Sequence, residues 1–64
     1  MLKINGIPTD AAGMTLLEYL IQAGADPARV AVELEGEIVP RDDYAHTLLE
    51  EGQTLEIVSF VGGG

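Results

Sequence analysis

Three consecutive glycines at the end of the sequence, Gly62, Gly63 and Gly64, are its most distinctive chemical feature. Glycine has no side chain to bury and loses more backbone entropy on ordering than any other residue, so a glycine run predicts a bare arm. With Gly64 as the last residue, such an arm can carry an unhindered carboxylate into a narrow active site, where a Cβ atom would clash. We therefore predict that the Gly64 carboxylate is the group on which another enzyme acts. An inert, frayed end is the alternative.

The rest of the sequence holds few groups that could perform catalysis or bind a metal. There is no cysteine, and the single histidine, His46, lies in a polar stretch typical of a protein surface. A nucleophile–base pair would need Ser59 or a threonine beside His46, and nothing in the spacing brings them together. The acidic residues form no loop that could supply about six oxygen ligands to a hard cation. We expect no enzymatic activity, no metal and no cofactor bound by the chain itself.

Composition indicates one small soluble domain. The 64 residues are 47% hydrophobic and carry a formal net charge of −8. Disorder requires low hydrophobicity together with high charge, so this chain should fold. Strong negative charge disfavours nucleic acids and anionic membranes as partners. It is equally compatible with docking to a basic protein surface and with a surplus of acid that only keeps a small protein soluble. The N-terminus lacks the pattern of a signal peptide, and no apolar run approaches the ~18 residues of a membrane span. We expect a cytoplasmic protein.

A strand hairpin is predicted at the start of the chain. Alternation over residues 1–5 indicates a half-buried strand, and Asn5-Gly6 is a strong tight-turn dipeptide. A second strand is predicted over residues 7–11. It should lie at a sheet edge, because Pro8 cannot donate a hydrogen bond to a ladder.

A helix is predicted over residues 16–23. Thr15 and Glu18 form a capping box, in which each side chain accepts a hydrogen bond from the backbone of the other residue. Gly24 is the expected helix stop. Apolar residues recur at spacings of three and four and predict one buried stripe. The stripe consists of Leu16, Leu17, Leu20 and Ile21.

The second half predicts three more strands, over residues 30–35, 37–39 and 54–60. Residues 41–49 are compatible with a turn of 3₁₀ helix capped by Asp42. One helix must then cover the apolar face of one mixed sheet. We expect an α+β protein of the β-grasp (ubiquitin-like) class, with a mixed sheet of four to five strands packed on one main helix. The expected domain covers residues 1–61, and the glycine tail covers 62–64.

Two groups of residues are candidates for partner binding. Glu33 and Glu35 share the outward face of a predicted strand, where a docking stripe for a basic partner and a solvated face are equally compatible with the pattern. Val58 and Phe60 form an apolar face at the end of the last strand, next to Val61 and the tail. Exposure of these side chains would mark a partner site, whereas burial of the strand on both faces is the alternative.

Several segments together resemble the sulfur carrier family of thiamine biosynthesis, the ThiS family, over nearly the whole chain. The segments are Met1-Leu2-Lys3-Ile4-Asn5-Gly6, Thr15-Leu16-Leu17-Glu18, Ile38-Val39-Pro40-Arg41, Leu49-Glu50-Glu51-Gly52-Gln53 and Glu56-Ile57-Val58-Ser59-Phe60-Val61-Gly62-Gly63-Gly64. The terminal glycine pair is shared by ubiquitin-like carriers in general. The Val39-Pro40-Arg41 segment in so short a chain points to the thiamine branch.

The resemblance implies that the chain is a protein substrate whose Gly64 carboxylate is adenylated with ATP by a ThiF-type enzyme. The adenylate would become a thiocarboxylate with sulfur from a donor such as a cysteine desulfurase, and a ThiG-type thiazole synthase would receive the sulfur. By the resemblance, Gly63 and Gly64 correspond to the functional glycine pair of the family. Gly62 is an additional glycine. Two alternatives stay open: a carrier for molybdopterin or another sulfur-transfer pathway, and a ubiquitin-like binding module whose tail is inert.

Overall fold

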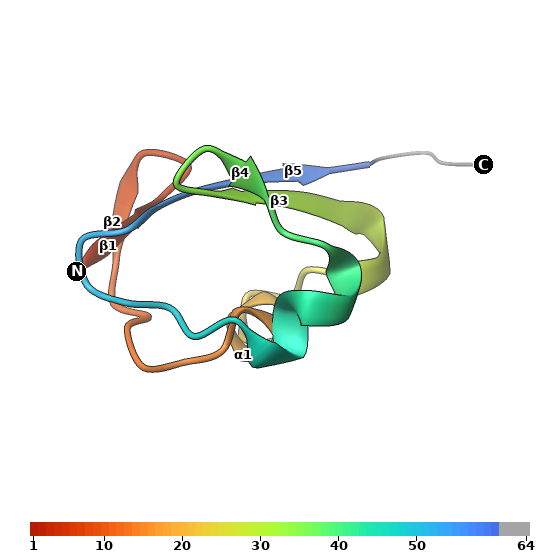
Figure 1. Cartoon of the computed structure of the whole chain (residues 1–64), viewed down its shortest axis with the longest axis horizontal. Helices are drawn as coiled ribbons and strands as arrows, with labels where there is room; N and C mark the ends of the chain where they lie inside the picture. Colours follow the sequence, from red (N-terminus) through yellow and green to blue (C-terminus); the bar gives the residue numbers. More distant parts are fainter. Residues whose placement is uncertain (61–64) are drawn as a thin grey trace.

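A mixed β-sheet and a layer of helical turns face each other in the molecule (Figure 1). The structure is a computed structural model, and it describes residues 1–60. The strands are β1 (Leu2–Ile4), β2 (Ile7–Thr9), β3 (Val30–Leu34), β4 (Glu37–Ile38) and β5 (Thr54–Ser59). The helical elements are α1 (Leu16–Gln22) and two 3₁₀ helices, η1 (Pro27–Arg29) and η2 (Arg41–His46). The predicted boundary after residue 61 and the predicted tail over residues 62–64 lie outside the described residues.

β5 occupies the middle of the sheet, although it is the last strand in the sequence. The strand order is β2-β1-β5-β3-β4, with β1 and β5 parallel and the other neighbours antiparallel. The parallel pairing places Lys3 opposite Thr54 and Ile4 opposite Leu55. The helical layer covers one face of the sheet (Figure 1). The prediction of a β-grasp domain is therefore confirmed, with five strands.

The N-terminal hairpin turns at Asn5-Gly6, where φ is 54° and 80°, as expected for this dipeptide. β2 lies at the sheet edge as predicted. It ends at Thr9, two residues early, because Thr9 pairs with Leu2, the first residue of β1. The Asn5 side chain has a second, unpredicted role. Its Oδ1 accepts a hydrogen bond from the Ile57 N–H at 2.7 Å, and its Nδ2 donates to the Ile57 carbonyl at 3.1 Å. The side chain thus joins the end of β1 to β5.

The capping box predicted at the start of α1 is present. The Thr15 hydroxyl accepts from the Glu18 N–H at 3.1 Å, and the Glu18 carboxylate accepts from the Thr15 N–H at 2.8 Å. Leu16 and Leu20 are fully buried, whereas Ile21 is 63% exposed. The prediction that Ile21 belongs to the buried stripe is therefore wrong. One residue advances the helix by about 100°, so Ile21 is turned away from the line through Leu16 and Leu20 that packs on the sheet.

Gly24 follows the helix as predicted, with φ of 80°. The η1 turn was not predicted, although its signal is readable in the sequence. Asp26 caps it by accepting a backbone hydrogen bond at 2.9 Å, and Pro27 opens it. η2 confirms the predicted 3₁₀ turn, but the prediction of Asp42 as its cap is wrong. The N-cap is Pro40, so Asp42 lies inside the turn, and no side chain caps it.

The hydrophobic core fills the space between the sheet and the helical layer. Its buried members are Leu2, Ile4, Ala11, Leu16, Leu20, Val30, Val32, Tyr44, Leu49 and Leu55. The Tyr44 hydroxyl from η2 donates to the Val30 carbonyl at 3.2 Å, so this buried polar atom is satisfied. Backbone hydrogen bonds of 2.8 Å join Leu16 to Thr47 and Leu49 to Met14. These bonds hold the start of α1 against the segment that leads into β5.

Candidate functional site

β5 leads toward the predicted tail and is held firmly at that end. Its last residue, Ser59, lies opposite Val30 of β3, and the Phe60 N–H donates to the Arg29 carbonyl at 2.8 Å. Hydrogen bonding therefore fixes the backbone as far as Phe60. The remaining predicted site residues lie outside the described residues: Val61, Gly62, Gly63 and Gly64. Their predicted roles stay predictions.

The sheet face that points away from α1, called the outer face below, carries an apolar patch near the end of β5. Val58 is 58% exposed and Phe60 is 53% exposed. The alternative that the last strand is buried on both faces is therefore wrong. Ile38 of β4 is 67% exposed and lies on the same face, because it pairs with the outward-facing Glu33. Ala31 lies half-buried opposite Val58. The patch thus spans β5, β3 and β4.

Two glutamates face each other beside this patch. Glu33 of β3 and Glu56 of β5 are exposed and directly opposite in the antiparallel register. The predicted pairing of Glu33 with Glu35 on one strand face is wrong, because β3 ends at Leu34 and Glu35 has φ of 53° in the turn to β4. Glu56 was missed, although alternation along the last strand places it on the same face as Val58. Only the register of the two strands identifies it as the partner of Glu33.

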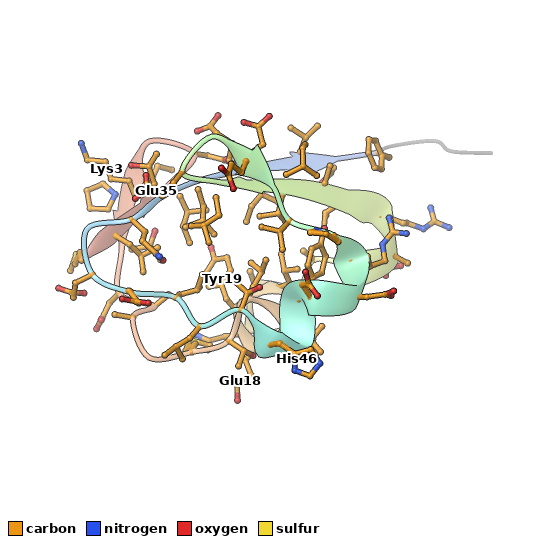
Figure 2. The ribbon with its side chains drawn as sticks, in the orientation of Figure 1. Lys3, Glu18, Tyr19, Glu35 and His46 are labelled. Carbon is orange, nitrogen blue, oxygen red and sulfur yellow. The ribbon has the colours of Figure 1, made fainter. Side chains whose placement is uncertain are left out.

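Neither Glu33 nor Glu56 takes part in an ion pair within residues 1–60. Within residues 1–60, the ion pairs lie elsewhere, between the Met1 amine and Glu51 at 2.6 Å and between Arg29 and Asp26 at 3.6 Å. Lys3 belongs to β1 (Figure 2), yet it forms no ion pair with any described residue. The two opposed carboxylates therefore have no cationic partner in this part of the chain. Like charges directly opposite in a sheet are destabilising.

An open recess, called the edge notch below, lies where β4 stops short of the length of β3. β4 has two residues and β3 has five, so the first half of β3 lacks a strand neighbour on that side. The notch has a volume of about 260 Å³ and is mainly apolar. It is lined by Val30, Ala31, Val32, Ile38, Val39, Pro40, Arg41, Tyr44 and Phe60.

Two backbone carbonyls of β3 next to the notch are already hydrogen-bonded. The Val32 carbonyl accepts from the Val39 N–H at 2.9 Å, and the Val30 carbonyl accepts from the Tyr44 hydroxyl at 3.2 Å. An added strand would have to displace these donors to pair with β3 here. A side chain can enter the notch without disturbing them.

Residues 1–60 contain no cluster of side chains suited to bind a metal ion. No three His, Cys, Asp or Glu side chains of this region converge as metal ligands would. His46 is exposed, as predicted, and lies in the helical layer, on the opposite side of the molecule from Lys3 and Glu35 (Figure 2). No helix in the described region is long and apolar enough to cross a membrane.

Comparison with known proteins gives consistent matches. The model of the ThiS family matches residues 2–64. The chain is 32% identical to the sulfur carrier protein ThiS of Escherichia coli, over 84% of this chain and 82% of that protein. It also matches the crystal structure of a thiamine biosynthesis protein (ThiS) from Geobacter metallireducens. That match has a TM-score of 0.80 and 33% identity, and it covers 98% of this chain and 97% of the other.

Longer proteins match as well. The chain is 45% identical to a protein named thiazole synthase from Paramagnetospirillum magneticum and 41% identical to one from Magnetococcus marinus. Each match covers 98% of this chain but 20% of the longer protein. The chain therefore spans about a fifth of the length of these relatives.

Proposed function

Because this chain belongs to the ThiS family, we propose that it is a sulfur carrier protein of thiamine biosynthesis. The observation that carries the proposal is its likeness to the sulfur carrier protein ThiS of Escherichia coli over 82% of that protein. In this proposal the chain is a substrate rather than an enzyme, and its chemistry takes place at the Gly64 carboxylate, in the cytoplasm. The sequence supports it with three consecutive glycines and with the lack of any cysteine that could hold sulfur elsewhere.

A carboxylate is a poor acyl donor, so the proposed chemistry begins with activation. A Gly64 carboxylate oxygen attacks the α-phosphorus of ATP in the adenylating enzyme, pyrophosphate leaves, and a mixed anhydride with AMP forms. The terminal sulfur of a persulfide on the donor then attacks the acyl carbon and AMP leaves. Thiols reduce the resulting acyl disulfide by two electrons, which releases the donor thiol and leaves a terminal thiocarboxylate. The chain contributes access to the partner's active site. Four residues beyond Phe60 span about 13 Å when extended, and glycines carry no Cβ to clash in a narrow channel.

Three partners follow from this chemistry. They are a ThiF-type adenylating enzyme that uses ATP, a sulfur donor such as a cysteine desulfurase, and a ThiG-type thiazole synthase that receives the sulfur. The relatives named thiazole synthase support the last of these, since a segment similar to this chain is part of a longer protein there. Joining a carrier to the enzyme that it serves raises its effective concentration to about millimolar. A fused and a separate arrangement can therefore serve the same reaction.

We propose the outer face as the surface that docks on these partners. Val58 and Phe60 supply exposed apolar area next to the root of the tail, and Val61 follows them in the sequence. Glu33 supplies negative charge for a basic partner. Glu35 is proposed only as a rim contact, because its N–H bonds to the start of β5, at the opposite end of the strand from Phe60.

An intact-mass measurement tests the carrier function. The wild-type chain, incubated with ATP, a sulfur source and the adenylating enzyme, should gain the mass of one oxygen replaced by sulfur. Variants that lack Gly64, or that carry one residue beyond it, should show no shift. His46→Ala is the matched control and should react like the wild type, because the proposal gives His46 no role. The mass of the protein isolated from its own cells would report the chain end directly.

No shift in the wild type, under conditions that convert Escherichia coli ThiS with its own enzymes, would contradict the carrier function. A binding module with an inert tail would then be the better explanation.

A pair of substitutions tests the docking face. Phe60→Asp should weaken binding to the adenylating enzyme and change the free energy of unfolding by no more than about 0.5 kcal/mol, since the side chain is exposed. Ile21→Asp makes the same charge change at a similarly exposed apolar residue of α1 and should leave binding unchanged. Calorimetric titration measures both affinities. Equal losses in the two variants would show that added charge, rather than the outer face, is responsible.

A further inference from the structure

We infer that the edge notch and the Glu33–Glu56 pair together receive one basic–apolar segment of the adenylating enzyme. One apolar side chain of that segment would enter the notch, and a neighbouring lysine or arginine would lie against the two carboxylates. The inference rests on the proposed function, which supplies the partner, and it adds the residues that select the partner.

The notch is large enough and apolar enough to receive an apolar side chain. Its volume of about 260 Å³ is below the roughly 300–1,000 Å³ of pockets that hold small-molecule ligands. Ala31, Ile38, Pro40 and Phe60 contribute apolar lining, and Arg41 adds one cation, whose Nε donates to the Pro27 carbonyl at 3.2 Å. The occupied carbonyls of β3 disfavour an added strand, so a side chain is the better occupant. Side chains that anchor protein interfaces typically fill recesses of this kind.

The two glutamates beside the notch favour a lysine or arginine next to the apolar side chain in the partner's segment. Ile38, which lines the notch, lies directly opposite Glu33, and Glu33 lies directly opposite Glu56. Neighbouring strands are about 4.8 Å apart, so the three side chains form a row about 10 Å long, the span of some three extended residues. Repulsion between the two carboxylates destabilises the free domain, and a cation supplied by the partner would relieve it. A lysine or arginine of the partner would therefore stabilise the complex relative to the free domain.

A second copy of this chain does not fit this row. The chain carries 11 acidic residues against three lysines and arginines, so most of its surface would repel the Glu33–Glu56 pair. Like-charge contacts across an interface cost several kcal/mol, whereas a basic partner is attracted and steered to the same site. The charge distribution thus favours a different, basic protein as the occupant.

The test examines the edge notch and the Glu33–Glu56 pair separately. Ala31→Leu should fill the notch without adding charge. Ile38→Ala removes part of the notch lining, and it cannot overpack because Ile38 is exposed and alanine is smaller. Glu33→Lys combined with Glu56→Lys reverses the local charge. The matched controls are Ala23→Leu for the notch and Asp10→Lys combined with Glu50→Lys for the charge reversal, all at exposed residues outside the notch and the Glu33–Glu56 pair. Binding to the purified ThiF-type adenylating enzyme is measured by calorimetry at low and at physiological salt, and urea unfolding checks that every variant is folded.

We expect each test variant to bind about tenfold more weakly than the wild type, and each control to bind within about twofold of it. The charge reversal should also reduce the salt dependence of binding by more than its matched control does. This inference would be overturned if the wild type forms the thiocarboxylate but the test variants bind as tightly as the controls. The carrier function would then remain intact. A wild type that is neither bound nor converted would overturn both. Loss of self-association in Ala31→Leu, with enzyme binding retained, would assign the notch to a second copy and refute the inference.

Discussion

Replacing Asn5 should separate two contributions that this residue makes to stability. Its side chain makes two hydrogen bonds to the backbone of Ile57, at 2.7 and 3.1 Å, and its backbone holds φ of 54° in the hairpin turn. Asn5→Gly keeps the turn conformation and removes only the two bonds. Asn5→Ala removes the bonds and also forces a Cβ atom into the left-handed region.

The magnitudes follow from these contacts. A hydrogen bond contributes a net ~0.5–1.5 kcal/mol, and water can replace part of both bonds because Asn5 is exposed. We therefore expect Asn5→Gly to lower the free energy of unfolding by about 1–2 kcal/mol. The left-handed conformation costs about 1–2 kcal/mol for alanine, so Asn5→Ala should lose about 2–4 kcal/mol. A domain of this size has about 3–10 kcal/mol in total, so either loss is a large fraction.

Urea unfolding followed by far-UV circular dichroism measures both variants. With an m-value of about 1 kcal/mol/M, Asn5→Gly should move the midpoint down by about 1–2 M. Glu35→Gly is the matched control. Glu35 also has positive φ, at 53°, but no side-chain hydrogen bond of Glu35 is found among the described residues. Glycine relieves the left-handed strain at a smaller entropy cost, so this variant should be no less stable than the wild type and should gain up to about 1 kcal/mol. An Asn5→Gly protein as stable as the wild type, or an Asn5→Ala protein as stable as Asn5→Gly, would refute the reasoning.

Three further substitutions test the core and the helix cap, all by the same unfolding assay. Leu20→Ala should cost about 2–5 kcal/mol because Leu20 is fully buried; a loss below 1 kcal/mol would place it outside the core. Thr15→Ala should cost about 1 kcal/mol through loss of the bond to the Glu18 N–H, and an unchanged midpoint would argue against the cap. Tyr44→Phe should cost about 1–3 kcal/mol because the buried Val30 carbonyl loses its hydroxyl donor, and the loss should be absent if the two groups are not bonded.

Features set by residues close in sequence could be predicted well. The capping box depends on Thr15 and Glu18, and the hairpin turn on Asn5 and Gly6, because in each case the interacting groups are at most three residues apart. The helix shows the limit of this approach. The spacing of its apolar residues predicted a stripe that included Ile21, but how much of the stripe is buried depends on how the helix lies on the sheet.

Features that need the strand order and register could not be predicted. Alternation places Glu56 on an outward face, but only the pairing of β3 with β5 sets it opposite Glu33. The Asn5–Ile57 contact joins residues 52 positions apart for the same reason. The edge notch exists because β4 is shorter than β3, and no local pattern encodes that difference. In contrast, the proposed reactive group at Gly64 comes from the sequence and the resemblance alone.

The central place of β5 also determines how the domain bears a mechanical load. β5 is paired with β1 on one side and with β3 on the other; its bonds to the antiparallel β3 run perpendicular to the strand, and those to the parallel β1 are slanted. A pull on the chain beyond Phe60, along the strand, loads the bonds to both neighbours in shear, so they must break together. The same pull on an edge strand such as β2 would be resisted by the bonds to one neighbour only. An enzyme that draws in the end of this chain would therefore pull on the strand best anchored to resist unfolding.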